Sequence, residues 1–443
     1  MRLDADTAAR RFRVSEDGWV TPLSLYAFVV TAVVGGLALD LSQVIAARTQ
    51  LQVAADIAAH AALYNRDALM ADPNAADIAK ERAIELARDS MPSARFGEYI
   101  TVDDIEFGRF DADTRTFTPD PDSSEAARVV AFRVSERANT VSSYLLRLAG
   151  IFDFDVVTAS IFETYRPTCF REGFVAEGVV DIQSNNSYTD GFCIHSNQYV
   201  SVNQNNYYEP GTVVSMPDTS DIDMPNSGFE KNEGLYEALR PGKYSLLIMN
   251  RLEAMLDGMT DEDSRYYRAS YVSDPNPVTV LPKKKMMPAD FHADRVNVMS
   301  CGGQRVTLEA EVFSDMVIIG ENCRFSMSNG TALENMTLFT TSTDNRSIDS
   351  PQGFRMGVDD DCGDGGGAQI VTWGGVNVAA NLEMYGSQII AAGPIDFAAN
   401  ASGIKGASMV SGATIDGTSN MSFGFCGEGM NDIFEADYFR MRA

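Results

Sequence analysis

The chain has 443 residues, of which 35 are Lys or Arg and 62 are Asp or Glu, so its formal net charge is −27. A charge this negative argues against nucleic acid as a partner, because proteins that bind a polyanion concentrate Lys and Arg on their surface. The length exceeds what one hydrophobic core usually covers, so we expect two or more domains. Three histidines leave little material for a His-rich metal site.

The first predicted element is a transmembrane helix at residues 18–39, which follows a cytoplasmic N-terminus at residues 1–17. No charged residue occurs between Asp17 and Asp40, and a helix of these 22 residues is long enough to cross a hydrocarbon core of ~30 Å. The residues that characterise this membrane anchor are Trp19, Pro22, Phe28, Gly35, Gly36 and Leu39.

The distribution of arginines predicts how this helix is oriented. Arginines occupy positions 2, 10, 11 and 13 before the span, whereas the equivalent window after it holds only Arg48. The positive-inside rule therefore places the N-terminus in the cytoplasm and everything after Asp40 outside the membrane. Two alternatives to a retained membrane anchor, a cleaved signal peptide and a buried core helix, fit this segment less well. A signal peptide has a shorter apolar region and a small-x-small cleavage site, and a core helix rarely stays charge-free for so long.

The cysteines agree with export, because all six follow residue 168. An even number of cysteines in an oxidising compartment predicts disulfides. Pairing between neighbours is one of the fifteen connectivities that six cysteines allow. These neighbour pairs are Cys169–Cys193, Cys301–Cys323 and Cys362–Cys426.

Residues 40–165 are predicted to form extracytoplasmic helices followed by a small α+β domain. Helical periodicity continues past Asp40 to about Tyr64, and Val53, Ile57 and Ala61 recur at i, i+4 as one apolar face for a partner. A second helix is expected at residues 74–91. Alternating apolar residues then predict strands on both sides of a short helix at residues 142–148.

Residues 166–435 are predicted to form a mainly β module. Short apolar strands begin at positions 296, 306, 316, 325 and 336 and are separated by Asn, Gly, Ser and Asp. This even spacing fits a β-solenoid, and a β-sandwich predicts much the same spacing. The high Asn, Gly and Ser content and the lack of long hairpin strands favour the solenoid, whose corners would hold stacked Asn side chains. Residues 217–290 interrupt the pattern with an Asp/Pro-rich linker and an amphipathic helix at 245–258, and are expected to be an insertion.

No catalytic or cofactor motif was found, so the chain is predicted not to be an enzyme. The sequence contains no GxSxG, HExxH or GxxxxGK[ST]. The sharpest polar cluster holds Asp359, Asp360, Asp361 and Asp364 beside glycines, and carboxylate oxygens are ligands that Ca²⁺ prefers. The cluster departs from the EF-hand pattern, and acidic Gly-rich loops are more often solvated turns, so Ca²⁺ is only a weak candidate and no other cofactor is expected.

The N-terminal motifs resemble a known family. Glu16-Asp-Gly-Trp-Val-Thr-Pro-Leu, the apolar span, Gly36-Leu-Ala-Leu-Asp and Ala47-Arg-Thr-Gln-Leu-Gln-Val-Ala-Ala-Asp are similar to the TadE/TadG-like family of tight-adherence (Flp) pilus assembly proteins, over residues 8–165. The resemblance implies a scaffold or minor pilus subunit that supports pilus biogenesis and surface attachment. It also implies an anchor in the bacterial inner membrane, with the bulk of the chain periplasmic or extracellular. Its partners would be the membrane and other pilus assembly proteins or pseudopilins.

Two departures refine this resemblance. The fifth residue after Gly18 is Leu23 where pseudopilin-like members have Glu, which favours a retained, TadG-like anchor. There is no DxSxS motif, so the metal site of a von Willebrand A domain cannot be carried over. The alternative functions are a pilus-associated adhesin that binds a glycan or protein through the solenoid and, on fold analogy alone, an anchored polysaccharide-acting enzyme.

Overall fold

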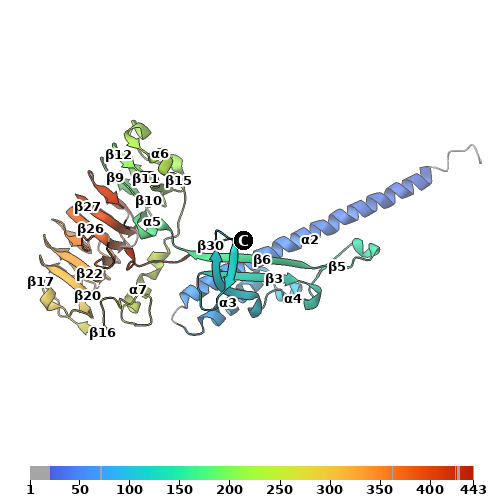
Figure 1. The fold of residues 1–443 in the computed structure, drawn as a ribbon, viewed down its shortest axis with the longest axis horizontal. Coiled ribbons are helices and arrows are strands. Elements are labelled where there is room, and N and C mark those ends of the chain that lie inside the picture. Colours follow the sequence, from blue (N-terminus) through green and yellow to red (C-terminus); the bar gives the residue numbers. More distant parts are fainter. Residues whose placement is uncertain (1–19, 70–71, 362, 425, 427–429, 443) are drawn as a thin grey trace, which may run out of the picture. The chain divides into compact units, whose positions relative to one another are not determined.

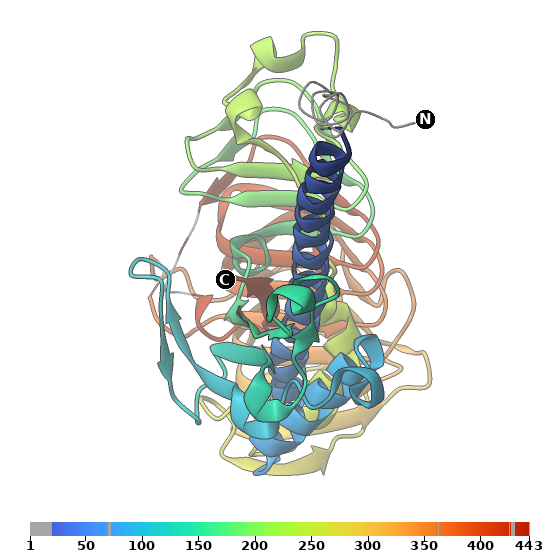
Figure 2. The same cartoon turned by 90° about the vertical axis from the view of Figure 1, so that its right-hand side faces the viewer.

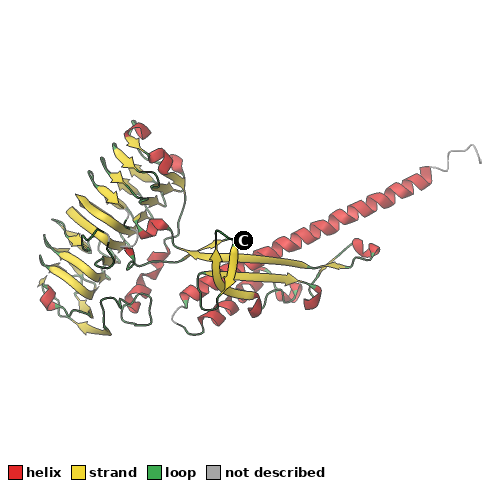
Figure 3. Cartoon of the chain, in the orientation of Figure 1, coloured by secondary structure: helices red, strands yellow, loops and turns green. Residues whose placement is uncertain are grey.

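The computed structural model describes residues 20–69, 72–361, 363–424, 426 and 430–442. The chain divides into two compact units, Met1–Tyr165 with Phe439–Ala443, and Arg166–Tyr438. The first unit combines helices with a small antiparallel sheet, and the second consists mainly of strands (Figures 1 and 3). An N-terminal apolar helix followed by mostly β structure is therefore the observed architecture.

The first unit begins with one long helix, α2 (Val20–Ala68), drawn in blue in Figure 1. Among the described residues, it is the one helix that is long and apolar enough to cross a membrane. We call residues 20–39 its exposed half, because every residue there except Gly36 is exposed. Residues 47–65 are its packed half, because one side of this stretch is buried in the core of the first unit.

The packed half of α2 lies against a helix and a sheet. The helix is α3 (Ala75–Ser90), close to the predicted range, and it ends just before Pro92. The sheet has the strand order β2 (Thr116–Pro119), β1 (Ile105–Asp111), β3 (Ala126–Arg133), β6 (Val156–Tyr165) and β30 (Tyr438–Met441). Alanines allow this close approach, and those at positions 54, 55, 58, 59 and 62 are fully buried.

The last strand of the sheet comes from the C-terminal end of the chain, which the sequence analysis did not predict. Arg442 donates its backbone N–H to the carbonyl oxygen of Ile161 at 2.8 Å. Arg440 and Arg442 also both form ion pairs with Glu163 of β6. The C-terminal strand thus covers the edge of β6 that would otherwise be free.

The predicted helix at residues 142–148 is replaced by a strand, a turn and a short helix. Val141–Ser142 (β4) pairs with Asp153–Phe154 (β5), and a four-residue 3₁₀ helix, η4 (Leu146–Ala149), lies between them. Gly150 follows η4 with a φ of 87°, a left-handed conformation that favours glycine. A 3₁₀ helix of this length is typical of a tight connection between paired strands.

In the second unit, the described residues form 23 strands of one sheet. They are β7 Gly173–Ala176, β8 Val180–Ile182, β9 Ser187–Tyr188, β10 Cys193–Ser196, β11 Val200–Val202, β12 Asn206–Tyr208, β13 Val213–Met216, β14 Asn232–Glu233, β15 Leu239–Pro241, β16 Asp274–Thr279, β17 Lys285–Met286, β18 Arg295–Ser300, β19 Arg305–Leu308, β20 Val312–Glu321, β21 Arg324–Met327, β22 Ala332–Thr340, β23 Ile348–Ser350, β24 Arg355–Met356, β25 Ala368–Thr372, β26 Val376–Ala391, β27 Ile395–Ser411, β28 Ile415–Gly417 and β29 Ser422–Gly424.

These strands pair in parallel and form three stacks. One stack runs β16-β18-β20-β22-β25-β26-β27-β7-β10-β13-β15. A second runs β17-β19-β21-β23-β26-β27-β28-β8-β11. The third joins the first segments of β20 and β22 to β24, β26, β27, β29, β9, β12 and β14. The β-sandwich alternative predicts antiparallel sheets instead.

The chain enters this arrangement in the middle. Strand β7 pairs with β10 on one side and with β27 on the other, so the first strands of the unit lie directly against its last ones. Figure 2 shows this as green strands next to red ones. The chain therefore fills one end of the stack first, returns along it, and fills the remainder from the opposite end.

The return segment is shorter than the predicted insertion at residues 217–290. Strands β14 and β15 at its start and β16 and β17 at its end pair within the stacks, which leaves residues 242–273 outside. The predicted helix is divided into a 3₁₀ helix, η7 (Leu247–Arg251), and α7 (Leu252–Gly258). The Tyr271 hydroxyl reaches the stack, where it bonds the Thr337 hydroxyl at 2.6 Å.

Asparagines stack at one corner of the turns, as predicted. Asn420, Asn185 and Asn205 all have left-handed φ values, and each amide in this row bonds the next, at 3.1 and 3.3 Å. At the neighbouring position, the buried Asn206 accepts the backbone N–H of Asn186 at 2.9 Å. Asparagine suits this corner because its short polar side chain tolerates the left-handed region and bonds the adjacent turn.

Two predicted disulfides are confirmed. Cys169 is bonded to Cys193 and Cys301 to Cys323, with Cα–Cα distances of 4.8 and 4.9 Å. Cys362 lies outside the described residues, so the pairing of Cys362 with Cys426 stays a prediction.

Between the stacks lies a continuous core of buried aliphatic and aromatic side chains. Within it, Tyr188 is stacked on Phe423 with parallel rings.

Candidate partner-binding site

The predicted anchor residues lie in the exposed half of α2. Pro22, Phe28, Gly35 and Leu39 are exposed, as expected for a surface that meets lipid, whereas Trp19 lies outside the described residues. Gly36 differs from them, because it is buried beneath Leu145: a Cβ added at Gly36 would lie 2.9 Å from the Cβ of Leu145.

One turn after Gly36, a buried carboxylate fixes the segment around Leu145 to α2. Asp40 accepts the backbone N–H groups of Tyr144, Leu145 and Leu146 at 2.5, 3.0 and 2.7 Å. Burial by itself raises the pKa of Asp40, but these three donors, helped by the positive charge of Arg147, outweigh it and hold the pKa below its usual value. The carboxylate therefore stays ionised and acts as a latch between the helix and this segment.

The predicted partner face in the packed half is divided between surface and core. Val53 is 48% exposed, Ile57 is half-buried and Ala61 is buried. An α-helix has 3.6 residues per turn, so positions four apart drift by ~40° at each step. From Val53 to Ala61 the face therefore turns from the solvent toward the core of the first unit. Of the three side chains, Val53 is the one that a partner can reach.

Val53 lines a groove at the junction of α2, the end of α3 and α4 (Ser93–Phe96). We call it the partner groove. It has a volume of about 600 Å³. Its lining residues are Ala46, Thr49, Gln50, Val53, Ser90, Met91, Pro92, Arg95 and Phe96. The groove is mainly apolar, and the exposed Arg95 at its edge lies over the Phe96 ring at 5.1 Å.

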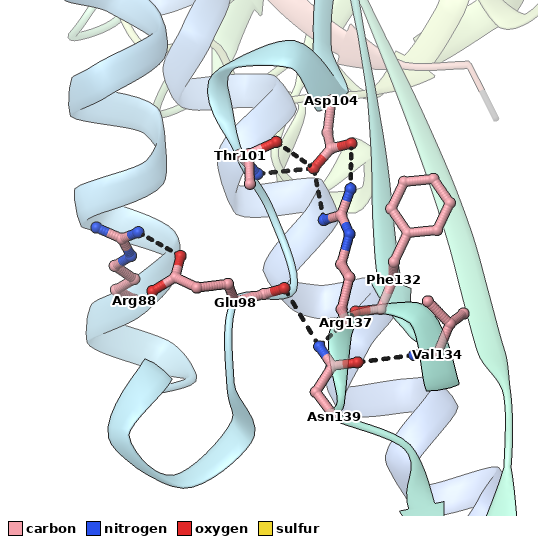
Figure 4. Close-up of polar contacts among 8 residues, drawn as sticks. All are labelled: Arg88, Glu98, Thr101, Asp104, Phe132, Val134, Arg137 and Asn139. Carbon is pink, nitrogen blue, oxygen red and sulfur yellow. Dashed lines mark hydrogen bonds and ion pairs between the residues drawn. The ribbon is translucent and has the colours of Figure 1, made fainter.

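A polar network holds the chain that follows α4 and so shapes one side of the groove (Figure 4). The Asp104 carboxylate accepts hydrogen bonds from both terminal nitrogens of Arg137 at 2.7 and 2.8 Å. The Asn139 amide donates to the carbonyl oxygens of Glu98 and Phe132, at 3.2 and 2.9 Å. These bonds tie the segment after α4 to strand β3.

The same network perturbs the ionisation of its acid. Burial raises the pKa of Asp104, but the hydrogen bonds from Arg137 and Thr101 more than compensate and keep the pKa below the ordinary aspartate value. Sequence reasoning did not identify this pair, because Asp104 and Arg137 are 33 residues apart and neither lies in a motif.

The weak Ca²⁺ candidate consists of exposed carboxylates that have other partners. Asp359, Asp360, Asp361 and Asp364 are all exposed, and Asp360 accepts the backbone N–H of Gly363 at 2.9 Å. Asp361 forms an ion pair with Lys405 at 3.3 Å. Within the described part of the chain, no group of three or more His, Cys, Asp or Glu side chains is placed to hold a metal ion.

A row of aspartates on the second stack was missed from the sequence. Asp396, Asp416 and Asp181 occupy the same position on β27, β28 and β8, and neighbouring strands lie ~4.8 Å apart. Burial and the two flanking carboxylates raise the pKa of Asp416. The signal that could have found the row is an aspartate next to Ile or Val in each of three strands, repeated in register.

A second cavity lies in the β unit, where β12, β14 and α6 (Leu235–Ala238) meet. It has a volume of about 440 Å³ and is lined by Tyr207 and by three glutamates at positions 209, 233 and 237. Tyr207 is exposed. In such a site the aromatic ring can stack on a sugar ring, and the carboxylates can accept hydrogen bonds from the sugar hydroxyls.

Family comparisons identify both halves of this organisation. Residues 173–427, which are more than half of the chain and contain the stacked strands β7 to β29, match a domain of unknown function, DUF7867. Residues 18–77, which contain α2, match the Flp pilus-assembly TadE/G-like family. No curated protein and no solved structure matches the chain. The chain therefore belongs to the DUF7867 family, and its N-terminal region confirms the resemblance to TadE/G-like proteins of Flp pilus assembly.

Proposed function

We propose that the protein is a membrane-anchored component of Flp pilus assembly, and that it acts as a scaffold or minor pilus subunit without a catalytic reaction. The observation that carries this proposal is that a family match and an apolar surface fall on the same helix. The TadE/G-like match at residues 18–77 covers α2, whose exposed half is a charge-free apolar surface of the length that a bilayer requires.

The proposal includes an orientation, with the N-terminus in the cytoplasm and both units outside the inner membrane. The arginines before the span support it. The disulfides Cys169–Cys193 and Cys301–Cys323 add independent support, because such bonds persist in oxidising compartments and are rare in the cytosol.

The finer fold of the β unit belongs to the proposal too. Parallel pairing in three stacks, with Gly173, Cys193 and Val213 in register along one of them, supports a β-solenoid. A solenoid of this kind is a rigid rod whose sides offer long surfaces for docking. We assign it the role of a rigid surface on which other pilus proteins dock.

The partner groove is the place where we expect another pilus assembly protein or pseudopilin to bind. A mainly apolar groove between helices fits the apolar face of a partner helix. Arg95 at the edge would favour a partner with an acidic side chain beside that face.

A second candidate function is a pilus-associated adhesin. The cavity beside Tyr207 supports it, because aromatic rings flanked by carboxylates suit a glycan. Immunogold labelling of sheared pili separates an adhesin or minor subunit, which travels with the pili, from a scaffold, which stays in the membrane fraction.

The experiment that tests the main proposal combines co-purification with a matched pair of variants. Val53→Arg places a charge in the partner groove, and Leu86→Arg places the same charge on α3 at a leucine that is 46% exposed and outside the groove. Wild-type protein and Leu86→Arg should both co-purify with pilus assembly proteins from solubilised membranes, and Val53→Arg should lose them while staying in the membrane. Equal recovery with all three would contradict the groove as the binding site, and no pilus protein with any of them would contradict the proposed function.

A further inference from the structure

The connection between β4 and β5 exposes more bulky apolar surface than any solvated turn requires. We call residues 144–152 the tip loop. Leu148 is 87% exposed and Phe152 is 62% exposed, and Tyr144, Leu145 and Ile151 are exposed as well. Five large apolar side chains exposed within nine residues mark an interaction surface, because single exposed apolar residues are common but contiguous ones are not.

The structure fixes this loop at one height along α2. The Asp40 latch holds the backbone of residues 144–146, and Leu145 covers Gly36 one turn earlier. Figure 1 shows the loop beyond β5, beside α2 and well away from the end of the helix at Ala68. The tip loop therefore meets the helix where the charge-free segment ends, with Leu145 just inside that segment.

We infer that the tip loop is a second membrane contact, whose apolar side chains enter the extracytoplasmic leaflet of the bilayer that α2 crosses. The inference rests on the proposed function in one respect, namely that α2 spans a membrane. The occupant is lipid because the loop is continuous with the exposed half of α2: a bilayer that covers Val33, Val34 and Leu37 up to Asp40 also covers side chains held beside Gly36.

The charges around the loop suit this position. Arg147 is exposed within the loop and has a side chain long enough to reach lipid phosphates while its stem stays among the apolar residues. Asp153 and Asp155 follow the loop on the side of the sheet and are exposed to water. Asp40, against which the loop is held, has its charge satisfied by three backbone donors and does not need water.

Two membrane contacts would fix the orientation of the first unit, whereas a single contact would not. A single helix leaves the unit free to rotate about the helix axis and to tilt. A loop inserted ~5–10 Å into the interface beside that helix removes the rotation, because turning the unit would draw apolar side chains into water or push the sheet into lipid. The partner groove would then face a constant direction above the membrane.

The test measures how deep an introduced tryptophan lies in a bilayer. Full-length protein is reconstituted in phosphatidylcholine vesicles with brominated acyl chains, and the bromines quench nearby tryptophan fluorescence. The background variant is Trp19→Phe, in which Trp373 of the second unit gives a constant signal. Leu148→Trp reports on the tip loop, and Phe152→Trp is a second reporter in case the first misfolds. Val30→Trp reports on the middle of the span, and Tyr64→Trp, 24 residues and ~36 Å beyond Asp40 along α2, is the control outside the bilayer.

The expected result is that bromines near the headgroups quench Leu148→Trp and Phe152→Trp more than bromines near the chain ends do. Val30→Trp should show the opposite order, and Tyr64→Trp no quenching with either lipid. If Val30→Trp is quenched while both loop reporters behave like Tyr64→Trp, the tip loop does not enter the bilayer and the inference is overturned. If Val30→Trp itself is not quenched, α2 does not cross the membrane, and the anchor in the proposed function fails instead.

Discussion

Helix α2 is continuous, yet its two halves are built from different residues. Its exposed half is rich in bulky and β-branched side chains, such as Val33 and Leu37, which are exposed. Its packed half is rich in alanine, and Ala54 and Ala58 are fully buried against the first unit. The packed half also carries the charged residues Arg48 and Asp56, so the two halves differ in hydropathy as well. Side-chain size along the helix therefore distinguishes the surface that we propose for lipid from the surface that packs on protein, because alanine lets backbones approach closely whereas lipid accommodates any apolar shape.

The largest expected effect comes from a charge in the exposed half. Val30→Arg places arginine near the middle of the span, which costs about 2.5–3.5 kcal/mol of insertion free energy. The variant should therefore be depleted from the membrane fraction, as measured by fractionation and alkaline extraction. Leu86→Arg, which adds the same charge on α3, should remain in the membrane. Equal membrane retention of both variants would show that the exposed half does not meet lipid.

The next effect reverses the comparison by enlarging one alanine in each half. Ala58→Leu overpacks a fully buried site and should destabilise the first unit by about 1–3 kcal/mol. Ala32→Leu makes the same change in the exposed half, where lipid gives way, and should leave stability unchanged. The measurement is the urea concentration at which the first unit of the reconstituted protein becomes sensitive to protease. A comparable loss in both variants would break the distinction between the halves.

Two adjacent glycines sharpen the comparison where the halves meet. Gly36→Leu drives a side chain into Leu145 of the tip loop, whereas a Cβ at Gly35 meets no atom within 4 Å. Both variants gain helix propensity to the same extent, so the difference between them, about 1 kcal/mol, isolates the clash. In the Leu148→Trp protein, Gly36→Leu should weaken quenching by brominated lipid and Gly35→Leu should not. Identical quenching would mean that the loop is not held against Gly36.

The smallest effect at neutral pH concerns Asp40. Its pKa in the folded protein lies below the ordinary value of 3.8, so the latch contributes stability above that pH and loses it as the pH falls through the folded pKa. Quenching of Leu148→Trp should be constant between neutral pH and about pH 5 and should fall in stronger acid. Asp40→Asn should remove this acid-dependent step. A step that persists in Asp40→Asn would assign the titration to another group.

The sequence predicted the first unit well where the signal is local. The charge-free run predicted the position of the exposed half of α2, and Pro92 predicted the end of α3, because these features act within a few residues. The C-terminal strand β30 and the pair of Asp104 with Arg137 were missed, since both join segments far apart in the chain and depend on the finished sheet.

In the second unit, the regular spacing of the strands could be predicted from the sequence, but the order in which the strands pair could not. The predicted strands at positions 296, 306, 316, 325 and 336 alternate between the first and second stacks, and the third stack was missed because most of its strands have two or three residues. All turns of the stack have similar edges, so nothing local indicates that β7 pairs with β27. The row of Asp396, Asp416 and Asp181 depends on that same pairing and could not be predicted without it.

The most direct test of the account is piliation in a deletion strain. Surface pili would be counted by electron microscopy after complementation with wild-type protein, Val30→Arg or Leu86→Arg at matched expression. We expect few or no pili in the deletion strain. Wild-type protein and Leu86→Arg should restore piliation, and Val30→Arg should not. Normal piliation without the gene, or full restoration by Val30→Arg, would contradict the claim that a membrane-anchored form of this protein supports pilus assembly.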